Sequence, residues 1–179
     1  KVELAGQTFK AGEDYIPRPT VKTVSGQLVF VGHGMVIKSK NINAYEGIDV
    51  KDKILVVSAG LPKGVQQNEL TGKLGEDYES VYSYAAKHGA KGIVNIPRSI
   101  QLTSWDASAR QAFSGGRIML ETGKTDNSLP EIVASAKLLN AIFQGEAIDG
   151  AEALKQSDSR EFAASFALKA DKKITLDIK

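Results

Sequence analysis

Short apolar runs, broken by glycine at fixed places, constrain the fold of this chain more than any other feature. Residues 28–31 are apolar and end in Gly32-His33-Gly34, and residues 53–58 are a second apolar run. Continuous apolar runs of this length predict buried strands. Two glycines beside a strand end predict a bend or a close approach of backbone. We therefore expect a strand over residues 27–37, interrupted at the glycines, and another over residues 53–58.

A helix and a third strand are expected after the second run. Within residues 76–87 the apolar side chains recur at helical spacing, and acidic side chains stand near the start, where the helix dipole favours them. Gly89 suits the left-handed residue that follows a helix. The apolar residues 91–96 then predict the third strand. Strands separated by helices are typical of a mixed α/β domain.

The rest of the chain is expected to add shorter elements, bounded by glycine and proline. These are irregular or short-strand structure over residues 1–20, a loop over 60–75, a short helix over 104–113, strands over 117–121 and 132–134, a helix over 135–144, one or two helical turns over 149–156, and a hairpin of residues 162–168 and 172–178. The closing run alternates apolar and polar residues as a half-buried strand should.

Composition describes an ordinary single domain and excludes several classes of protein. At 179 residues the chain can bury a core without disulfide bonds, and it has no cysteine to form them. Its net charge of +2 gives no sign of nucleic-acid binding. No run of about 18 apolar residues is present, so we expect no insertion into a membrane. The chain begins at Lys1 within foldable sequence, and we expect it to be cut from a longer protein.

Familiar catalytic motifs are absent from the sequence. No His-Glu-X-X-His helix and no Gly-X-Ser-X-Gly elbow occur. Gly123-Lys124-Thr125 copies the end of a phosphate-binding loop, but Ile118 stands where that loop needs glycine. Histidines that stand alone, such as His33 and His88, are more often structural than metal ligands. A hydrolase that uses one of them beside a serine or a carboxylate is the alternative.

The order of these segments resembles the protease-associated (PA) domain, in the form inserted in secreted zinc aminopeptidases and glutamate carboxypeptidase-like peptidases. The similar stretches are residues 28–34, Tyr45, residues 47–57, 85–93 and 129–135, and the closing residues 165–178. Two residues depart from the family pattern, because His33 replaces a tyrosine and Asp52 replaces a glycine. Asp52 must therefore tolerate the turn that this glycine adopts.

The resemblance implies a swivelling β/β/α fold, an α/β arrangement of partly closed β-sheets flanked by short helices. Residues 1–24 would be an N-terminal segment packed on a PA-like domain of residues 25–179, which carries an insertion near residues 98–117. The module would be non-catalytic, with no cofactor of its own and with zinc only in a separate catalytic domain. The expected parent is a secreted or periplasmic zinc aminopeptidase or carboxypeptidase. A PA-type module of a serine protease or a sorting receptor is the alternative.

The expected partners are the catalytic peptidase domain of the parent and a peptide or protein substrate. Contacts of this kind are usually made by loops, and tryptophan and arginine are enriched at binding hot spots. The candidate contact residues are Arg98, Trp105, Arg110, Phe113 and Arg117 in the insertion, with His33 and Tyr45 at a neighbouring edge. The alternative for Trp105 is that it covers a small satellite core. A structural role is the alternative for His33 and for Tyr45.

Overall fold

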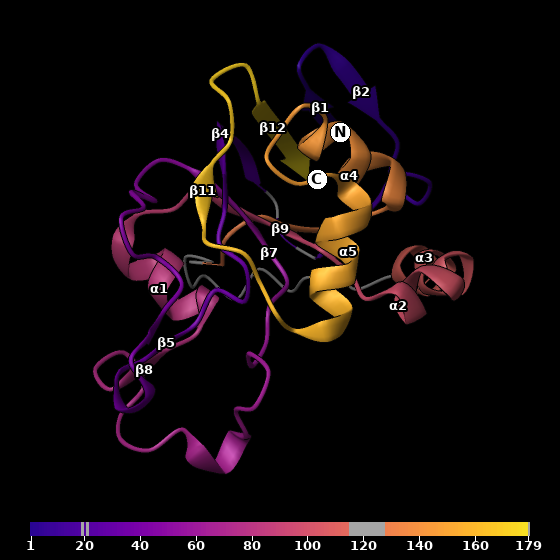
Figure 1. The fold of residues 1–179 in the computed structure, drawn as a ribbon. Coiled ribbons are helices and arrows are strands. Elements are labelled where there is room, and N and C mark those ends of the chain that lie inside the picture. Colours follow the sequence, from indigo (N-terminus) through magenta and orange to yellow (C-terminus); the bar gives the residue numbers. More distant parts are fainter. Residues whose placement is uncertain (19, 21, 115–127, 179) are drawn as a thin grey trace, which may run out of the picture.

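A mixed β-sheet forms the body of the protein, which the computed structural model describes for residues 1–18, 20, 22–114 and 128–178. Within these residues nine strands form the sheet, with the order β2-β1-β12-β4-β7-β9-β10-β3, and β11 pairs with β4 outside this path (Figure 1). The strands are β1 (Val2–Leu4), β2 (Gln7–Phe9), β3 (Tyr15–Pro17), β4 (Lys22–Phe30), β7 (Ile54–Val57), β9 (Gly92–Asn95), β10 (Glu131–Ala134), β11 (Phe166–Ala167) and β12 (Lys173–Ile178). A smaller sheet has the order β6-β5-β8 and consists of β5 (Val36–Ile37), β6 (Ile42–Asn43) and β8 (Tyr78–Glu79).

The large sheet curls until its two edges approach each other. β2 lies at one edge and β3 at the other, yet only residues 10–14 separate them along the chain. A connection this short spans at most roughly 20 Å. The sheet is therefore nearly closed, in the manner of a barrel, and a few short helices flank it.

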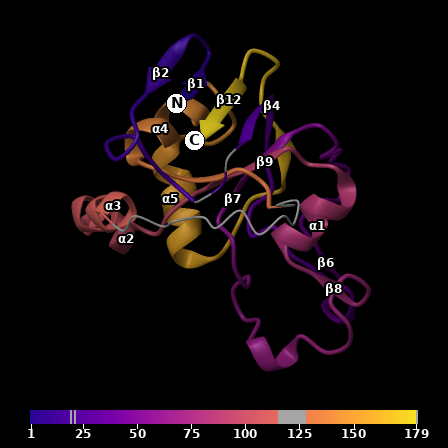
Figure 2. The ribbon, with the colours of Figure 1, turned by 180° about the vertical axis from the view of Figure 1, so that it is seen from behind.

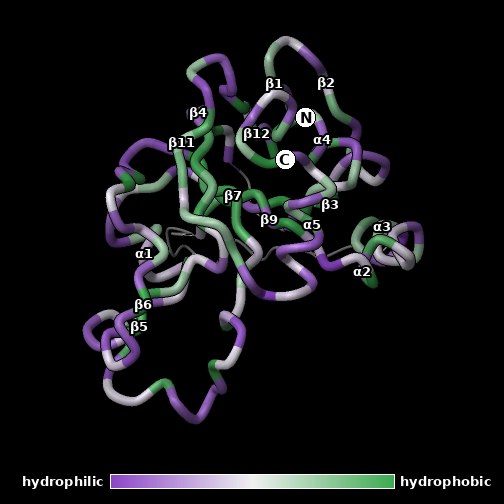
Figure 3. The backbone as a smooth tube through the Cα atoms, in the orientation of Figure 1, coloured by the Kyte–Doolittle hydropathy of each residue, from purple (hydrophilic) through white to green (hydrophobic). Residues whose placement is uncertain are grey.

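Four parallel strands occupy the centre of the sheet. Leu28 of β4 pairs with Ile54 of β7, and Val94 of β9 pairs with Ile132 of β10. Every residue of β7 and β9 is buried, as expected for parallel strands covered on both faces. Figure 3 shows hydrophobic residues gathered on β4, β7 and β9. The apolar runs expected over residues 53–58 and 91–96 are confirmed as these buried strands.

Short helices lie around the central strands. They are α1 (Val81–His88), α2 (Ser99–Thr103), α3 (Trp105–Ser114), α4 (Ala136–Phe143) and α5 (Gly150–Ser159), and among them none is long and apolar enough to cross a membrane. α1 and α5 lie on opposite sides of these strands (Figures 1 and 2). The Ser135 hydroxyl caps α4 by accepting a hydrogen bond from the Leu138 N–H at 3.3 Å. Gly89 ends α1 in the left-handed conformation, as the sequence predicted.

Two hydrophobic clusters follow from this layering. One face of β4 and β7 contributes Leu28, Phe30, Ile54 and Val56, which pack with α4 and α5. The opposite face contributes Val29, Val31, Leu55 and Val57, which pack with Val81 and Ala85 of α1. Successive residues of a strand point to opposite faces, so a continuous apolar run serves both clusters.

The helix expected over residues 76–87 begins later than predicted. Glu79 pairs with Val36 of β5, and the Asp77 carboxylate accepts a hydrogen bond from the Lys73 N–H at 2.8 Å. The acidic residues therefore shape a turn and a short strand rather than a first helical turn. Ser80 then caps the helix, because its hydroxyl accepts from the Ser83 N–H at 3.3 Å.

The other expected helices are confirmed with different lengths. The helix predicted over residues 104–113 is α3, and the separate helix α2 precedes it. The helical turns expected over residues 149–156 extend as α5 to Ser159, where Arg160 adopts the left-handed conformation. The strand predicted over residues 117–121 and the glycines that would end α3 lie outside the described residues.

The closing hairpin predicted from residues 162–168 and 172–178 is wrong. β11 and β12 both pair with β4, with Phe166 opposite Phe30 and Lys173 opposite Gln27. Between β11 and β12 the chain leaves the sheet in a turn, in which the Lys172 N–H donates a hydrogen bond to the Lys169 carbonyl. It then pairs with β4 again, along the earlier part of that strand. An alternating pattern fixes which face a strand buries, but it does not identify the strand's partner.

The N-terminal segment belongs to the sheet. β1 pairs with β12, so that Val2 faces Leu176, and β3 pairs with β10. The segment therefore supplies both edges of the sheet, as short strands. The boundary expected between residues 24 and 25 falls inside β4, which begins at Lys22.

The Gly32-His33-Gly34 turn needs glycine for two reasons. Gly32 and Gly34 have φ angles of +53° and +66°, which residues other than glycine rarely adopt. A Cβ atom on Gly34 would also stand 2.8 Å from Val57 and Val81, and one on Gly32 would stand 3.0 Å from the Cβ of Phe162. The turn therefore lets β4 end in close contact with β7, α1 and the segment that contains Phe162.

We expect Gly34→Ala to lower the free energy of unfolding by about 2–4 kcal/mol, because it adds backbone strain and a clash with buried valines. Gly47→Ala is the matched control, since Gly47 has φ of +71° but a Cβ atom added there would meet no other atom within 4 Å. That variant should lose about 1 kcal/mol, from the backbone conformation alone. Urea unfolding of both variants measures the difference, and equal losses would contradict the packing argument.

Candidate binding pocket

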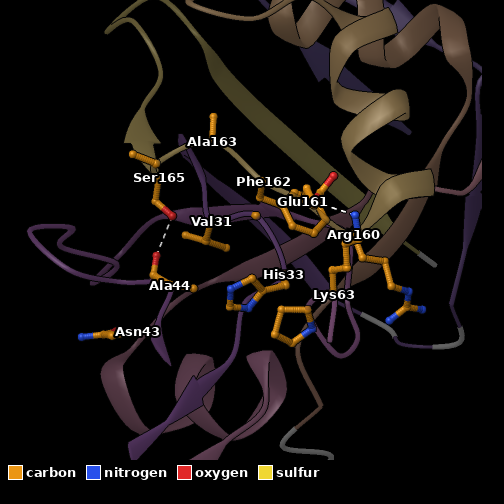
Figure 4. A pocket seen from close by; sticks show the side chains of 13 residues that line it. Val31, His33, Asn43, Ala44, Lys63, Arg160, Glu161, Phe162, Ala163 and Ser165 are labelled. Carbon is orange, nitrogen blue, oxygen red and sulfur yellow. Dashed lines mark hydrogen bonds and ion pairs between the residues drawn. The ribbon is translucent and has the colours of Figure 1, made fainter. Parts of the chain in front are cut away.

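A pocket of about 460 Å³ opens beside the Gly32-His33-Gly34 turn (Figure 4). One wall is the turn itself, and the opposite wall is residues 160–165, which lead from α5 to β11. Asn43 and Ala44 form a third side, and Pro62 and Lys63 form the fourth. Segments from four separate parts of the chain therefore meet at the end of β4.

His33 lies in this pocket as a neutral hydrogen-bond donor. Its Nδ1 accepts a hydrogen bond from the Met35 N–H at 3.0 Å, which leaves the proton of the neutral ring on Nε2. Its ring meets Phe162 edge to face, with the centroids 5.9 Å apart. Burial lowers the pKa of His33 to about 4, because the charged form would lose its water. At neutral pH the side chain can therefore donate from Nε2 but carries no charge.

Tyr45 does not line the pocket, but it holds the glycine turn that forms one wall. It is buried, its hydroxyl donates to the Gly34 carbonyl at 2.9 Å, and its ring stacks on Tyr84 at 3.6 Å. Burial raises the pKa of Tyr45, so the hydroxyl keeps its proton. The Gly34 turn is held in place by this hydrogen bond.

In the wall formed by residues 160–165, one backbone N–H is used among the described residues and its two neighbours are not. The Ala163 N–H donates inward to the Gln156 Oε1 at 3.0 Å. Within the part of the chain that the structure describes, the N–H groups of Phe162 and Ala164 on either side donate no hydrogen bond. Both of these residues line the pocket. These two N–H groups, which we call the outer row, are therefore donors in the pocket wall that no described residue uses.

Side-chain and backbone contacts fix the two ends of this wall. The Lys63 N–H donates to the Arg160 carbonyl at 3.0 Å, and the Lys63 ammonium pairs with Glu161 at 2.7 Å. At the other end the Ser165 hydroxyl donates to the Ala44 carbonyl at 2.5 Å. The exposed Lys63–Glu161 pair adds little stability by itself. The two backbone-directed bonds are what hold the wall against its neighbours.

The structure separates the candidate residues of the insertion from this pocket. The Trp105 Nε1–H donates to the Gly12 carbonyl at 2.8 Å, and the Phe113 ring lies near the same glycine. Arg110 is exposed on α3, and Arg98 lines a different pocket. Arg117 lies outside the described residues. Trp105 and Phe113 therefore pack, half-buried and exposed respectively, against the N-terminal segment.

Sequence reasoning missed the residues that form the opposite wall. Phe162 and Ala164 are ordinary apolar residues, and the sequence placed both in a predicted strand of a hairpin. The single available signal was Gly32, because paired glycines indicate that something approaches the backbone closely. It could not say that the approaching residue is Phe162.

The hydrogen bonds of the histidines bear on the hydrolase alternative. Among the described residues, no serine or carboxylate is hydrogen-bonded to His33, and the His88 ring stacks on Tyr84 at 4.0 Å. The same residues contain no group of three His, Cys, Asp or Glu side chains that could hold a metal ion.

No protein-family model matches the chain, and no curated protein matches it. Among solved structures, the chain is similar to an aminopeptidase from Aneurinibacillus sp. strain AM-1, with 12% sequence identity and a TM-score of 0.44. The similarity covers 98% of this chain and 29% of that one. The chain thus spans less than a third of that aminopeptidase.

We expect His33 to make the stability of the protein fall as the pH falls from 6.5 towards 4. The pKa is lower in the folded state than its ordinary value of 6.5, so the unfolded chain binds this proton first. The added slope approaches about 1.4 kcal/mol per pH unit within that window. His33→Asn should remove it, because the Asn side-chain oxygen can accept from the same N–H without titrating. Urea unfolding across the window would contradict this if both proteins showed the same pH dependence.

Proposed function

We propose that this chain is a PA-type module with a swivelling β/β/α fold, which contacts peptide or protein chains beside a separate catalytic peptidase domain. The ordered resemblance carries this proposal, because the similar stretches from residue 28 to residue 135 follow the elements around the central parallel strands in sequence order. Residues 28–34 are the end of β4 and its turn, and residues 47–57 lead into β7. Residues 85–93 join α1 to β9, and residues 129–135 are β10 with the cap of α4.

The two departures from the family pattern are compatible with this fold. Asp52 stands where the pattern has glycine, and it adopts φ of +61°. Aspartate tolerates the left-handed conformation better than most residues, and Lys91 pairs with its carboxylate at 3.2 Å. His33 stands where the pattern has tyrosine and anchors the turn through Met35. Neither substitution disturbs the elements that carry the resemblance.

The pocket beside His33 is the contact surface that we assign to this module. Its outer row of N–H groups, on Phe162 and Ala164, suits the carbonyl groups of an extended peptide. The neutral His33 can donate a further hydrogen bond from Nε2. Main-chain recognition of this kind accepts many sequences, which suits a module that guides varied polypeptides. Zinc and the catalytic residues would lie in the separate domain, and the parent would be secreted or periplasmic.

The isolated chain should not hydrolyse aminoacyl-p-nitroanilides, with or without added zinc, while the longer parent protein should do so with zinc. The reason is that the proposed module carries no catalytic residues of its own. Release of p-nitroaniline measures both proteins under one set of conditions. Zinc-dependent cleavage by the isolated chain would reject the module and return attention to His33 and His88.

Ala164→Pro in the parent should raise KM for a polypeptide substrate by about three- to tenfold, since it removes one main-chain donor from the pocket wall. The kcat and KM for a single aminoacyl-p-nitroanilide should not change, because that substrate is too short to reach the wall. Ala164→Ser is the matched control and keeps the N–H. If both variants behave alike, or if the small substrate is affected equally, Ala164 does not act as the donor.

A further inference from the structure

A second pocket, of about 460 Å³, lies at the carboxyl ends of the central parallel strands. β7 contributes Ser58 just past its end, β9 contributes Asn95, and β10 contributes Val133. α2 forms one side of the pocket through Ile100, and α2 is held to α5 because the Ser99 N–H donates to Asp158 at 2.8 Å. Carboxyl ends of parallel strands commonly form the bottom of a ligand site.

The lining is basic and carries no acidic side chain. Arg18, Arg98 and Arg160 line the pocket, and none of its described lining residues is Asp or Glu. Glu131 stands just behind the lining and is 8% exposed. Its Oε1 pairs with Arg18 at 3.0 Å, and it also accepts hydrogen bonds from Tyr82 and Asn95. Glu131 therefore balances the charge of Arg18, and it forms no ion pair with Arg98 or Arg160.

Arg98 and Arg160 form no ion pair with any other residue that the structure describes. The Arg160 Nη1 donates to the Leu61 carbonyl at 2.6 Å, which is a neutral acceptor. The nearby Asp158 accepts from the N–H and the hydroxyl of Ser99 and makes no ion pair with either arginine. Two arginines that form no ion pair with a described residue therefore line one pocket, and a guanidinium group matches the geometry of a carboxylate.

An apolar surface beside the arginines favours a carboxylate that belongs to a peptide. Ile100 is 70% exposed at the pocket, and it offers an apolar surface beside the arginines. The pocket therefore combines a monoanion site with a place for an apolar group.

We propose that this pocket, named here the arginine pocket, binds a peptide carboxylate next to an apolar side chain, with Arg98 as the principal contact. The carboxylate comes either from the C-terminus of a peptide or from an acidic side chain within one. The proposal does not rest on the function proposed above, because it concerns a site of this chain alone and is tested without a peptidase partner.

The test uses the isolated chain and four probes in NMR titrations that follow the amides of Asn95 and Ile96. The probes are N-acetyl-Gly-Gly-Leu with a free carboxylate, the same peptide as its amide, N-acetyl-Gly-Glu-Leu-amide, and inorganic phosphate. We expect at least one of the carboxylate peptides to bind, with an affinity that falls as salt is added. The two carboxylate peptides distinguish a terminal carboxylate from a side-chain one.

Arg98→Gln should weaken that binding by about tenfold or more, since a charge-assisted hydrogen bond is lost. Arg110→Gln is the matched control, because it removes the same charge from an exposed position that does not line the pocket. An unchanged amide spectrum elsewhere shows that Arg98→Gln is folded. Equal binding of acid and amide peptides, tighter binding of phosphate, equal loss in both variants, or no binding at all would overturn the proposal.

Discussion

The whole structure depends on how β4 is shared between its neighbours. On one side its last residues, Leu28 to Phe30, pair in parallel with β7. On the other side β12 pairs with its first residues and β11 with its end, both antiparallel. Because nine residues of one strand serve three partners, β4 joins the antiparallel N- and C-terminal strands to the parallel centre. The short connection of residues 10–14 then keeps the edge strands β2 and β3 close together, so that the sheet is nearly closed.

Both candidate sites also follow from where the central strands end. β4 ends in a turn that only glycine can form at Gly34, and residues 160–165 pack against that turn to form the pocket beside His33. β7, β9 and β10 end together, and their carboxyl ends form the bottom of the arginine pocket. In each case backbone geometry fixes the place, and a few polar side chains determine the chemistry.

The sequence predicts the centre of this fold better than its edges. The apolar composition of residues 53–58 predicts a buried strand, and Ser135 and Gly89 predict the start of one helix and the end of another through their local chemistry. The partner of a strand is a long-range property, so the pairing of Phe166 with Phe30 could not be read from either segment. The residues of the two candidate sites are the hardest to predict for the same reason. Residue type marks Arg98 and His33 as candidates, but Phe162 and Arg160 gain their roles only through contacts made in the folded protein.

Arg160 gives the two pockets a common wall. It lines both, and it ends α5 with φ of +59°. Its carbonyl accepts from the Lys63 N–H and its guanidinium donates to the Leu61 carbonyl, so both parts of the residue are tied to the segment that follows β7. A Cβ atom on Gly60 would stand 2.9 Å from that guanidinium, so glycine is what allows the close approach. The chain beyond this segment extends away from the body towards β8 (Figure 1). A displacement of residues 60–63 would therefore move the shared wall and change the shape of both pockets together.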